Sequence, residues 1–200
     1  MDLLLAPRIE EVRTLGILSG SFNPPTVAHV ELARAALDRV DAVLLVVPRV
    51  FPHDKTFTGA TLDQRIDMLH QIAFDEPRFG VAVAERGLFI DIAREARALL
   101  GAIDLWFLCG ADAAARIVDW DYGEPRAFHR MLEEFGLLVA RRQTVYEPPA
   151  DMAHRIEMLR VEEMDEVSST EVRNRIRTDV DWQTLVPAEI HRHVQEIYKI

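Results

Sequence analysis

The residue run from Ala42 to Val47 constrains the fold of this chain most strongly. It reads Ala-Val-Leu-Leu-Val-Val, which is apolar throughout and rich in β-branched side chains. A strand with one face in water alternates apolar and polar side chains, whereas a parallel strand that is covered on both faces does not. The run therefore predicts a buried strand of a parallel sheet, whose strands must be joined by long, usually helical, connections.

The rest of the chain alternates between strand-like and helix-like segments. The expected strands are 14–19, 42–47, 79–84, 105–109, 136–140 and one within 156–161. The expected helices begin near residues 25, 61, 90, 126 and 187, with two more after residues 110 and 168. Pro48 is expected to end the second strand. This alternation predicts an α/β fold, a Rossmann-like parallel sheet with helices on both faces. We expect a single domain over residues 14–200, preceded by an N-terminal extension over residues 1–13.

Composition limits the class of protein. A chain of 200 residues, 49% of them hydrophobic, is long enough to bury a large core. The net charge of -10 argues against a nucleic-acid partner. No run approaches the ~20 apolar residues of a membrane span, so no membrane partner is expected. The one cysteine, Cys109, is expected in the core; a chain without an intrachain disulfide suits the cytoplasm.

Residues 20–29 read Gly-Ser-Phe-Asn-Pro-Pro-Thr-Val-Ala-His and lie between a predicted strand and a predicted helix. Free backbone N–H groups and the helix dipole make such a turn a natural anion site. The turn lacks Gly-x-Gly-x-x-Gly and Gly-Lys-Ser/Thr, so it is neither a dinucleotide fingerprint nor a P-loop. Ligands of open α/β sheets bind beyond the carboxyl ends of the strands. The turns expected to meet at that edge are those at Gly20, Pro48, Gly110 and Ser168.

Two segments resemble the signatures of the nucleotidylyltransferase superfamily. Residues 20–29 are similar to Gly-x-Phe-Asp/Asn-Pro followed by His/Thr-x-Gly-His, and residues 167–173 are similar to Ile-Ser-Ser-Thr-x-x-Arg. Further segments resemble the nicotinate/nicotinamide mononucleotide adenylyltransferases: Pro52-His53-Asp54-Lys55, Gly110-Ala111-Asp112 with Trp120, and Leu185-Val186-Pro187. The resemblance spans residues 14–200. It implies transfer of AMP from ATP to a pyridine mononucleotide in NAD biosynthesis, with Mg²⁺ present and pyrophosphate released.

The resemblance implies that ATP is held by both signatures. Its expected ligands are the backbone of Gly20, Ser21 and Phe22 and the side chains of Thr26, His29, Ser168, Ser169, Thr170 and Arg173. A histidine can donate to a phosphate and add charge in the transition state, and an arginine fork suits phosphate oxygens. We therefore expect Thr26, His29 and Arg173 to be the catalytic residues. Thr26 and the serines are also ordinary helix caps, and the two roles are compatible.

The expected acceptor-binding residues are Asn23, Lys55, Asp112 and Trp120. An aromatic face such as that of Trp120 suits a flat pyridine ring. No protein metal site is expected, so Mg²⁺ comes with the ATP substrate.

The chain departs from the family pattern in three places. Ala28 replaces a glycine, Asp54 is an extra residue before Lys55, and residues 87–93 replace a Ser-Tyr-Thr-x-Asp-Thr stretch. The acceptor is therefore left open between nicotinate mononucleotide, nicotinamide mononucleotide and another phosphorylated acceptor. A nucleotide-binding regulatory protein without turnover is the alternative class. Whether the chain forms a homo-oligomer is also left open.

Overall fold

The computed structural model describes residues 1–51, 59–140, 146–161 and 167–198. Its strands are β1 (Asp2–Leu5), β2 (Thr14–Ser19), β3 (Ala42–Val50), β4 (Phe79–Arg86), β5 (Asp104–Gly110), β6 (Gly136–Ala140) and β7 (Ile156–Leu159). They form a seven-stranded sheet in the order β1-β4-β3-β2-β5-β6-β7. Every neighbouring pair is parallel except β1 and β4. The predicted α/β fold with a Rossmann-like parallel sheet is confirmed.

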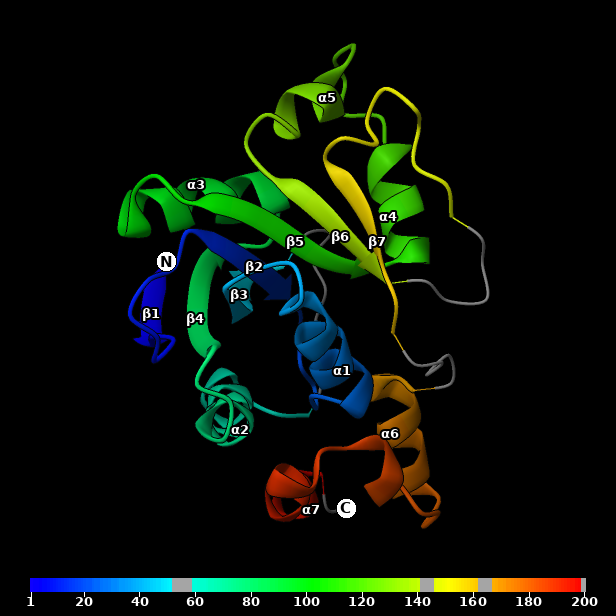
Figure 1. The fold of residues 1–200 in the computed structure, drawn as a ribbon. Coiled ribbons are helices and arrows are strands. Elements are labelled where there is room, and N and C mark those ends of the chain that lie inside the picture. The colour runs from blue at the N-terminus through cyan, green and yellow to red at the C-terminus, as the bar shows by residue number, and fades with distance from the viewer. Residues whose placement is uncertain (52–58, 141–145, 162–166, 199–200) are drawn as a thin grey trace.

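Helices cover both faces of the sheet. They are α1 (Val27–Ala36), α2 (Leu62–Phe74), α3 (Phe89–Leu100), α4 (Ala111–Val118), α5 (Ala127–Met131), α6 (Ser169–Arg177) and α7 (His191–Ile197), with short 3₁₀ turns η2 (Gln183–Leu185) and η3 (Ala188–Ile190). Figure 1 shows α1, α2, α6 and α7 on one face and α3, α4 and α5 on the other. Among the described residues, none of these helices is long and apolar enough to cross a lipid bilayer.

The run from Ala42 to Val47 contributes side chains to two hydrophobic cores, one on each face of the sheet. Val43, Leu45 and Val47 pack with the side chains of α1 and α2, whereas Leu44 and Val46 pack with those of α3 and α4. Every residue of the run is buried. The absence of alternation in the sequence thus has the expected cause, a strand that is covered on both faces.

The prediction that Pro48 ends this strand is wrong, because β3 continues to Val50. Val46 faces β2, since its carbonyl accepts from Gly20 N across 3.1 Å. Pro48, two residues later, faces the same side, where β2 has already ended at Ser19. Its missing N–H therefore interrupts no ladder, and the strand stays paired with β4 on its other side.

The predicted helix starts agree with the structure better than the predicted helix lengths do. At the start of α2, Thr61 Oγ1 accepts from Gln64 N, and Gln64 Oε1 accepts from Thr61 N, which confirms the predicted capping box. The helix expected from residue 126 to residue 135 is shorter, and α5 ends at Met131. The last helix begins as η3 and becomes α7 only at His191.

The order of the strands defines where a ligand can sit. The chain passes from β2 to β3 on one side, and β5 pairs with the other side of β2. Such a reversal opens a crevice beyond the carboxyl ends of the two central strands. The turn after Ser19 and the turn at Gly110 flank this crevice. At the far edge of the sheet, β1 adds an antiparallel strand drawn from residues 1–13.

Candidate functional site

The turn after β2 is anchored on the core by the ring of Phe22. This residue is 1% exposed and has a left-handed backbone, with φ 48°. A Cβ on Gly20 would lie 3.3 Å from the Phe22 ring, so a glycine at this position allows the backbone to pass close to that ring. The buried ring fixes the main chain of Gly20, Ser21 and Phe22 directly after the carboxyl end of β2.

Side chains from two other helices hold the carbonyl groups of this turn. Arg65 Nη1, from α2, donates to Ser21 O across 3.1 Å. Ser169 Oγ, from α6, donates to Pro24 O across 2.7 Å, and Arg173 Nη1 donates to Asn23 O. The two signature segments, 145 to 150 residues apart in sequence, are therefore in direct contact, as the expected convergence of the turns requires.

The first turn of α1 joins Thr26 to His29. Thr26 N donates to His29 Nδ1 across 3.1 Å, and Thr26 Oγ1 lies 2.6 Å from the same nitrogen. His29 thus occupies the position that a glutamate or glutamine has in a capping box. The Phe22 ring packs against it, with centroids 5.1 Å apart. Thr26 is buried and His29 is half-buried, so the imidazole has a fixed orientation at the start of the helix.

The hydroxyl groups at the start of α6 have structural partners of their own. Ser168 Oγ accepts from Glu171 N across 3.1 Å, which is the helix-cap role. Thr170 Oγ1 accepts from Arg173 Nη2 across 3.3 Å. Ser168 and Thr170 are exposed, so each hydroxyl can meet a phosphate in addition to its contact within the protein.

The four residues expected to bind the acceptor are placed differently from one another. Asn23 is 2% exposed, and its Oδ1 accepts from Ala60 N and from Tyr198 OH, so this side chain faces the protein interior. Asp112 is exposed in the first turn of α4, directly after β5. Trp120 follows α4 and is 55% exposed. Lys55 lies outside the described residues.

Sequence reasoning missed Arg65. This guanidinium is 7% exposed and also donates from Nε to Thr61 O across 3.2 Å. Burial lowers the pKa of Arg65 from its ordinary value. The available signal was its position on the apolar stripe of α2, three residues after Leu62 and four before Leu69. A charged residue on such a stripe is rarely buried without a partner.

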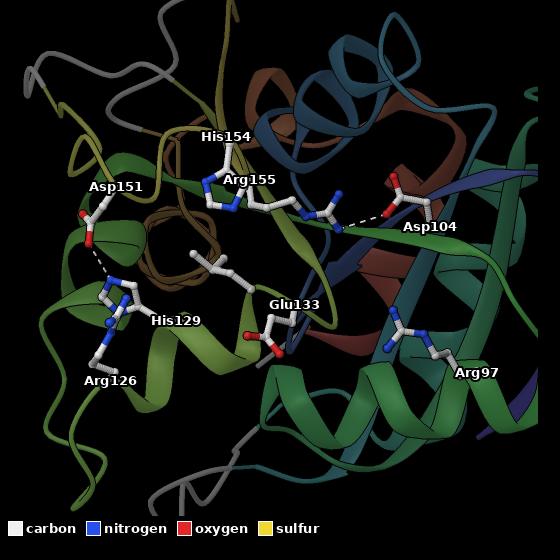
Figure 2. A pocket seen from close by; sticks show the side chains of 9 residues that line it. Arg97, Asp104, Arg126, His129, Glu133, Asp151, His154 and Arg155 are labelled. Carbon is white, nitrogen blue, oxygen red and sulfur yellow. Dashed lines mark hydrogen bonds and ion pairs between the residues drawn. The ribbon is translucent and has the colours of Figure 1, made fainter.

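A cleft of about 460 Å³ lies at the opposite ends of the strands, near the first residues of β5 and β7. Figure 2 shows the side chains that line it. Its charged side chains are largely paired within the protein. Arg155 bonds to Asp104 across 2.9 Å, and His129 bonds to Asp151 across 2.7 Å. None of the predicted site residues in the described part of the chain lines it. The candidate site is therefore the crevice beyond the carboxyl ends of the two central strands.

Comparison with known proteins identifies the family of the chain. The cytidylyltransferase-like family model matches residues 17–175, which include both signature segments. The chain is 33% identical to the "Probable nicotinate-nucleotide adenylyltransferase" of Solibacter usitatus, over 87% of this chain and 93% of that protein. It is 30% identical to a protein of the same name from Thermus thermophilus, over 91% of this chain and 96% of that protein.

The fold is shared with a solved structure, the Plasmodium falciparum nicotinic acid mononucleotide adenylyltransferase complexed with NaAD. The TM-score is 0.67 at 18% identity, over 92% of this chain and 95% of that chain. Three findings agree on the family: the contact between the two signature segments, the family-model match, and the relatives that match over nearly their full length. The chain belongs to the cytidylyltransferase-like family and, within it, to the nicotinate-nucleotide adenylyltransferases.

Proposed function

We propose that this protein transfers the AMP moiety of ATP to nicotinate mononucleotide, with release of pyrophosphate, as a step of NAD biosynthesis. The observation that carries the proposal is the contact between the two signatures, in which Ser169 and Arg173 donate to the carbonyls of Pro24 and Asn23. Relatives named for this activity match the chain over nearly their whole length. Those names favour nicotinate over nicotinamide as the acceptor base.

The reaction requires no nucleophile from the protein. A phosphate oxygen of the mononucleotide attacks the α-phosphorus of ATP, a new P–O bond forms, and the bond to the β-phosphate oxygen breaks. The electron pair leaves with pyrophosphate. Catalysis of this kind consists of positioning and charge stabilisation. The one cysteine fits this scheme, because burial raises the pKa of Cys109 to about 12 and keeps the thiol protonated.

His29 is suited to donate a hydrogen bond to a phosphate oxygen. The Thr26 N–H can only donate, so His29 Nδ1 acts as the acceptor of their 3.1 Å bond. In the neutral ring the proton is then on Nε2. The ring that carries this Nε2–H donor is oriented by Thr26 and Phe22 before the substrate binds. Preorganised donors of this kind are the main source of stabilisation for charge that develops in a transition state.

The donors around the turn suit phosphate oxygens better than they suit a bare metal ion. They are backbone N–H groups, hydroxyls, an imidazole and the guanidiniums of Arg65 and Arg173. Within the described ranges, no group of three histidine, cysteine or acidic side chains could hold a metal ion. Mg²⁺ would therefore be bound as the ATP complex, coordinated by phosphates and water, and would neutralise charge on the phosphate oxygens.

The acceptor side of the crevice is assigned to Asp112 and Trp120. Asp112 could accept from a ribose hydroxyl, and the exposed ring of Trp120 could stack on the pyridine. Phe89, in the segment that departs from the family pattern, stacks on Phe107 with centroids 4.2 Å apart. Its half-buried ring thus packs against the core.

The test is pyrophosphate release from ATP and Mg²⁺ with nicotinate or nicotinamide mononucleotide. We expect release with nicotinate mononucleotide and a loss of about 10²–10³ in kcat for His29→Ala. His129→Ala is the matched control, because His129 lines the cleft at the opposite ends of the strands, and its activity should stay within about twofold of wild type. ATP binding without any pyrophosphate release would favour the regulatory alternative and contradict the proposal.

A further inference from the structure

The side chain of Asn23 connects three distant segments of the chain. Asn23 Oδ1 accepts from Ala60 N across 3.1 Å, just before α2 begins. It also accepts from the hydroxyl of Tyr198, which follows α7 and lies 175 residues away. The Asn23 backbone carbonyl accepts from Arg173 of α6. One residue of the turn is thus held by donors from α6, from the end of α7 and from the approach to α2.

The packing around this junction is tight. A Cβ on Gly59 would lie 2.8 Å from Asn23 Oδ1 and 3.0 Å from Tyr198 Cε1, and Gly59 has a φ of 120°. Only glycine suits such a position, so the two hydrogen bonds are enclosed by the backbone of residues 59–60. Tyr198 is 9% exposed and Asn23 is 2% exposed. A buried amide oxygen that lost one of these donors would have little access to water in its place.

The Tyr198 hydroxyl acts as the donor. Burial raises the pKa of Tyr198, and the guanidiniums of Arg173 and Arg65 only partly oppose this effect. The hydroxyl therefore stays protonated throughout the neutral range. Those same arginines donate to the carbonyls of Asn23 and Ser21, so tyrosine, arginines and turn form one connected set.

We propose that Tyr198 is a positioning residue for ATP binding, which acts by holding Asn23 and thereby the turn of residues 20–26. Tyr198 does not touch the substrate; it fixes the residue that follows the Gly20–Phe22 backbone. The inference rests on the proposed function, since it assigns the turn to the ATP phosphates. It adds that the C-terminal helix sets the affinity of the site.

The experiment is to measure the dissociation constant of ATP with Mg²⁺ by calorimetry, together with the KM for each substrate, for wild type and Tyr198→Phe. The variant keeps the buried ring and removes only the hydroxyl. We expect ATP affinity to fall about tenfold, as loss of one buried hydrogen bond allows. The KM for the mononucleotide should stay within about twofold.

Val194→Ala is the matched control, because Val194 is fully buried on α7 and its truncation leaves a cavity while the Tyr198 hydroxyl is retained. This variant should melt at a lower temperature than Tyr198→Phe and still bind ATP as wild type does. Equal losses of ATP affinity in both variants would show that Tyr198 is merely structural, and the proposal would be wrong.

A double-mutant cycle with Asn23→Ala tests the connection itself. If Tyr198 acts through Asn23, then Tyr198→Phe has no further effect on ATP affinity once Asn23 is alanine. Additive losses would overturn the inference. Calorimetry needs no turnover, so a wild type that binds ATP but releases no pyrophosphate would refute the proposed function and leave this test intact.

Discussion

Arg65 places its guanidinium beneath the turn and donates to the backbone carbonyl of Ser21 across 3.1 Å. The side chain approaches from α2 and is almost fully enclosed. Although burial lowers its pKa, an arginine starts so high that it stays charged in any ordinary buffer. The turn that we propose for the triphosphate is therefore backed by a buried positive charge.

Replacing Arg65 by methionine keeps much of the side-chain volume and removes both backbone contacts. Because the carbonyls of Ser21 and Thr61 then lose a buried donor, we expect the free energy of unfolding to fall by about 1–3 kcal/mol. ATP should also bind more weakly. Urea denaturation and ATP titration measure the two effects. Arg34→Met is the control: it removes an exposed pair with Glu31 and should cost less than about 0.5 kcal/mol. Similar losses in both variants would contradict this role of Arg65.

Thr26→Val removes the hydroxyl that lies 2.6 Å from His29 Nδ1 and keeps the shape of the side chain. We expect kcat to fall, because the imidazole loses one of the groups that orient it, and we expect α1 to lose about 1 kcal/mol at its first turn. Thr26→Ser retains a hydroxyl and should recover most of the activity. Steady-state kinetics and thermal unfolding of the two variants decide the matter, and equal kcat values for valine and serine would exclude a role for the hydroxyl.

The stability of the protein should depend on pH through Asp41. Its Oδ2 accepts from Arg13 N, Thr14 N and Thr14 Oγ1 at 2.8–2.9 Å, and these bonds, led by the one from Thr14 N, hold the pKa of Asp41 below its ordinary value. The unfolded chain takes up this proton more readily than the folded chain. The stabilisation is therefore fully present above about pH 4 and is lost as the pH falls through the lowered pKa of the folded state.

Asp41→Asn removes the charge that accepts these bonds. We expect it to lower the free energy of unfolding by about 1 kcal/mol at pH 7, a modest value because the carboxylate is largely exposed. The difference between variant and wild type should shrink below about pH 4. Urea midpoints from pH 7 to pH 3 measure it. A difference that stayed constant over that range would show that charge is not involved.

Trp120→Leu tests the acceptor side of the crevice. Stacking of a heterocycle on an aromatic ring is worth about 1–3 kcal/mol, so the KM for the mononucleotide should rise about tenfold or more while the KM for ATP stays unchanged. Trp120→Phe keeps an aromatic face and should retain most of the affinity. Quenching of tryptophan fluorescence by the mononucleotide should be present in wild type and weaker in both variants. If ATP binding weakened instead, the ring would belong to the other half of the site.

Features that depend on neighbouring residues could be predicted from the sequence. The Thr61 and Gln64 capping box and the buried run from Ala42 to Val47 are of this kind, because the sequence alone contains the cause. Whether a strand can continue through Pro48 depends on where the neighbouring strand β2 ends. The residues around Pro48 therefore could not predict it. The same holds for Asn23 and Arg65, whose partners lie 175 and 44 residues away. Resemblance identified the residues of the turn, but only the packed structure shows what holds them.

The turn of residues 20–26 is synthesised early, but three of the side chains that donate hydrogen bonds to it are synthesised last. The six parallel strands from β2 to β7 end at Leu159, whereas Ser169, Arg173 and Tyr198 lie beyond them. A nascent chain can thus complete its sheet on the ribosome before the turn has received its last three donors. Contacts of such long sequence separation form late and slowly. The newly made protein should therefore acquire its fold first and its affinity for nucleotide afterwards.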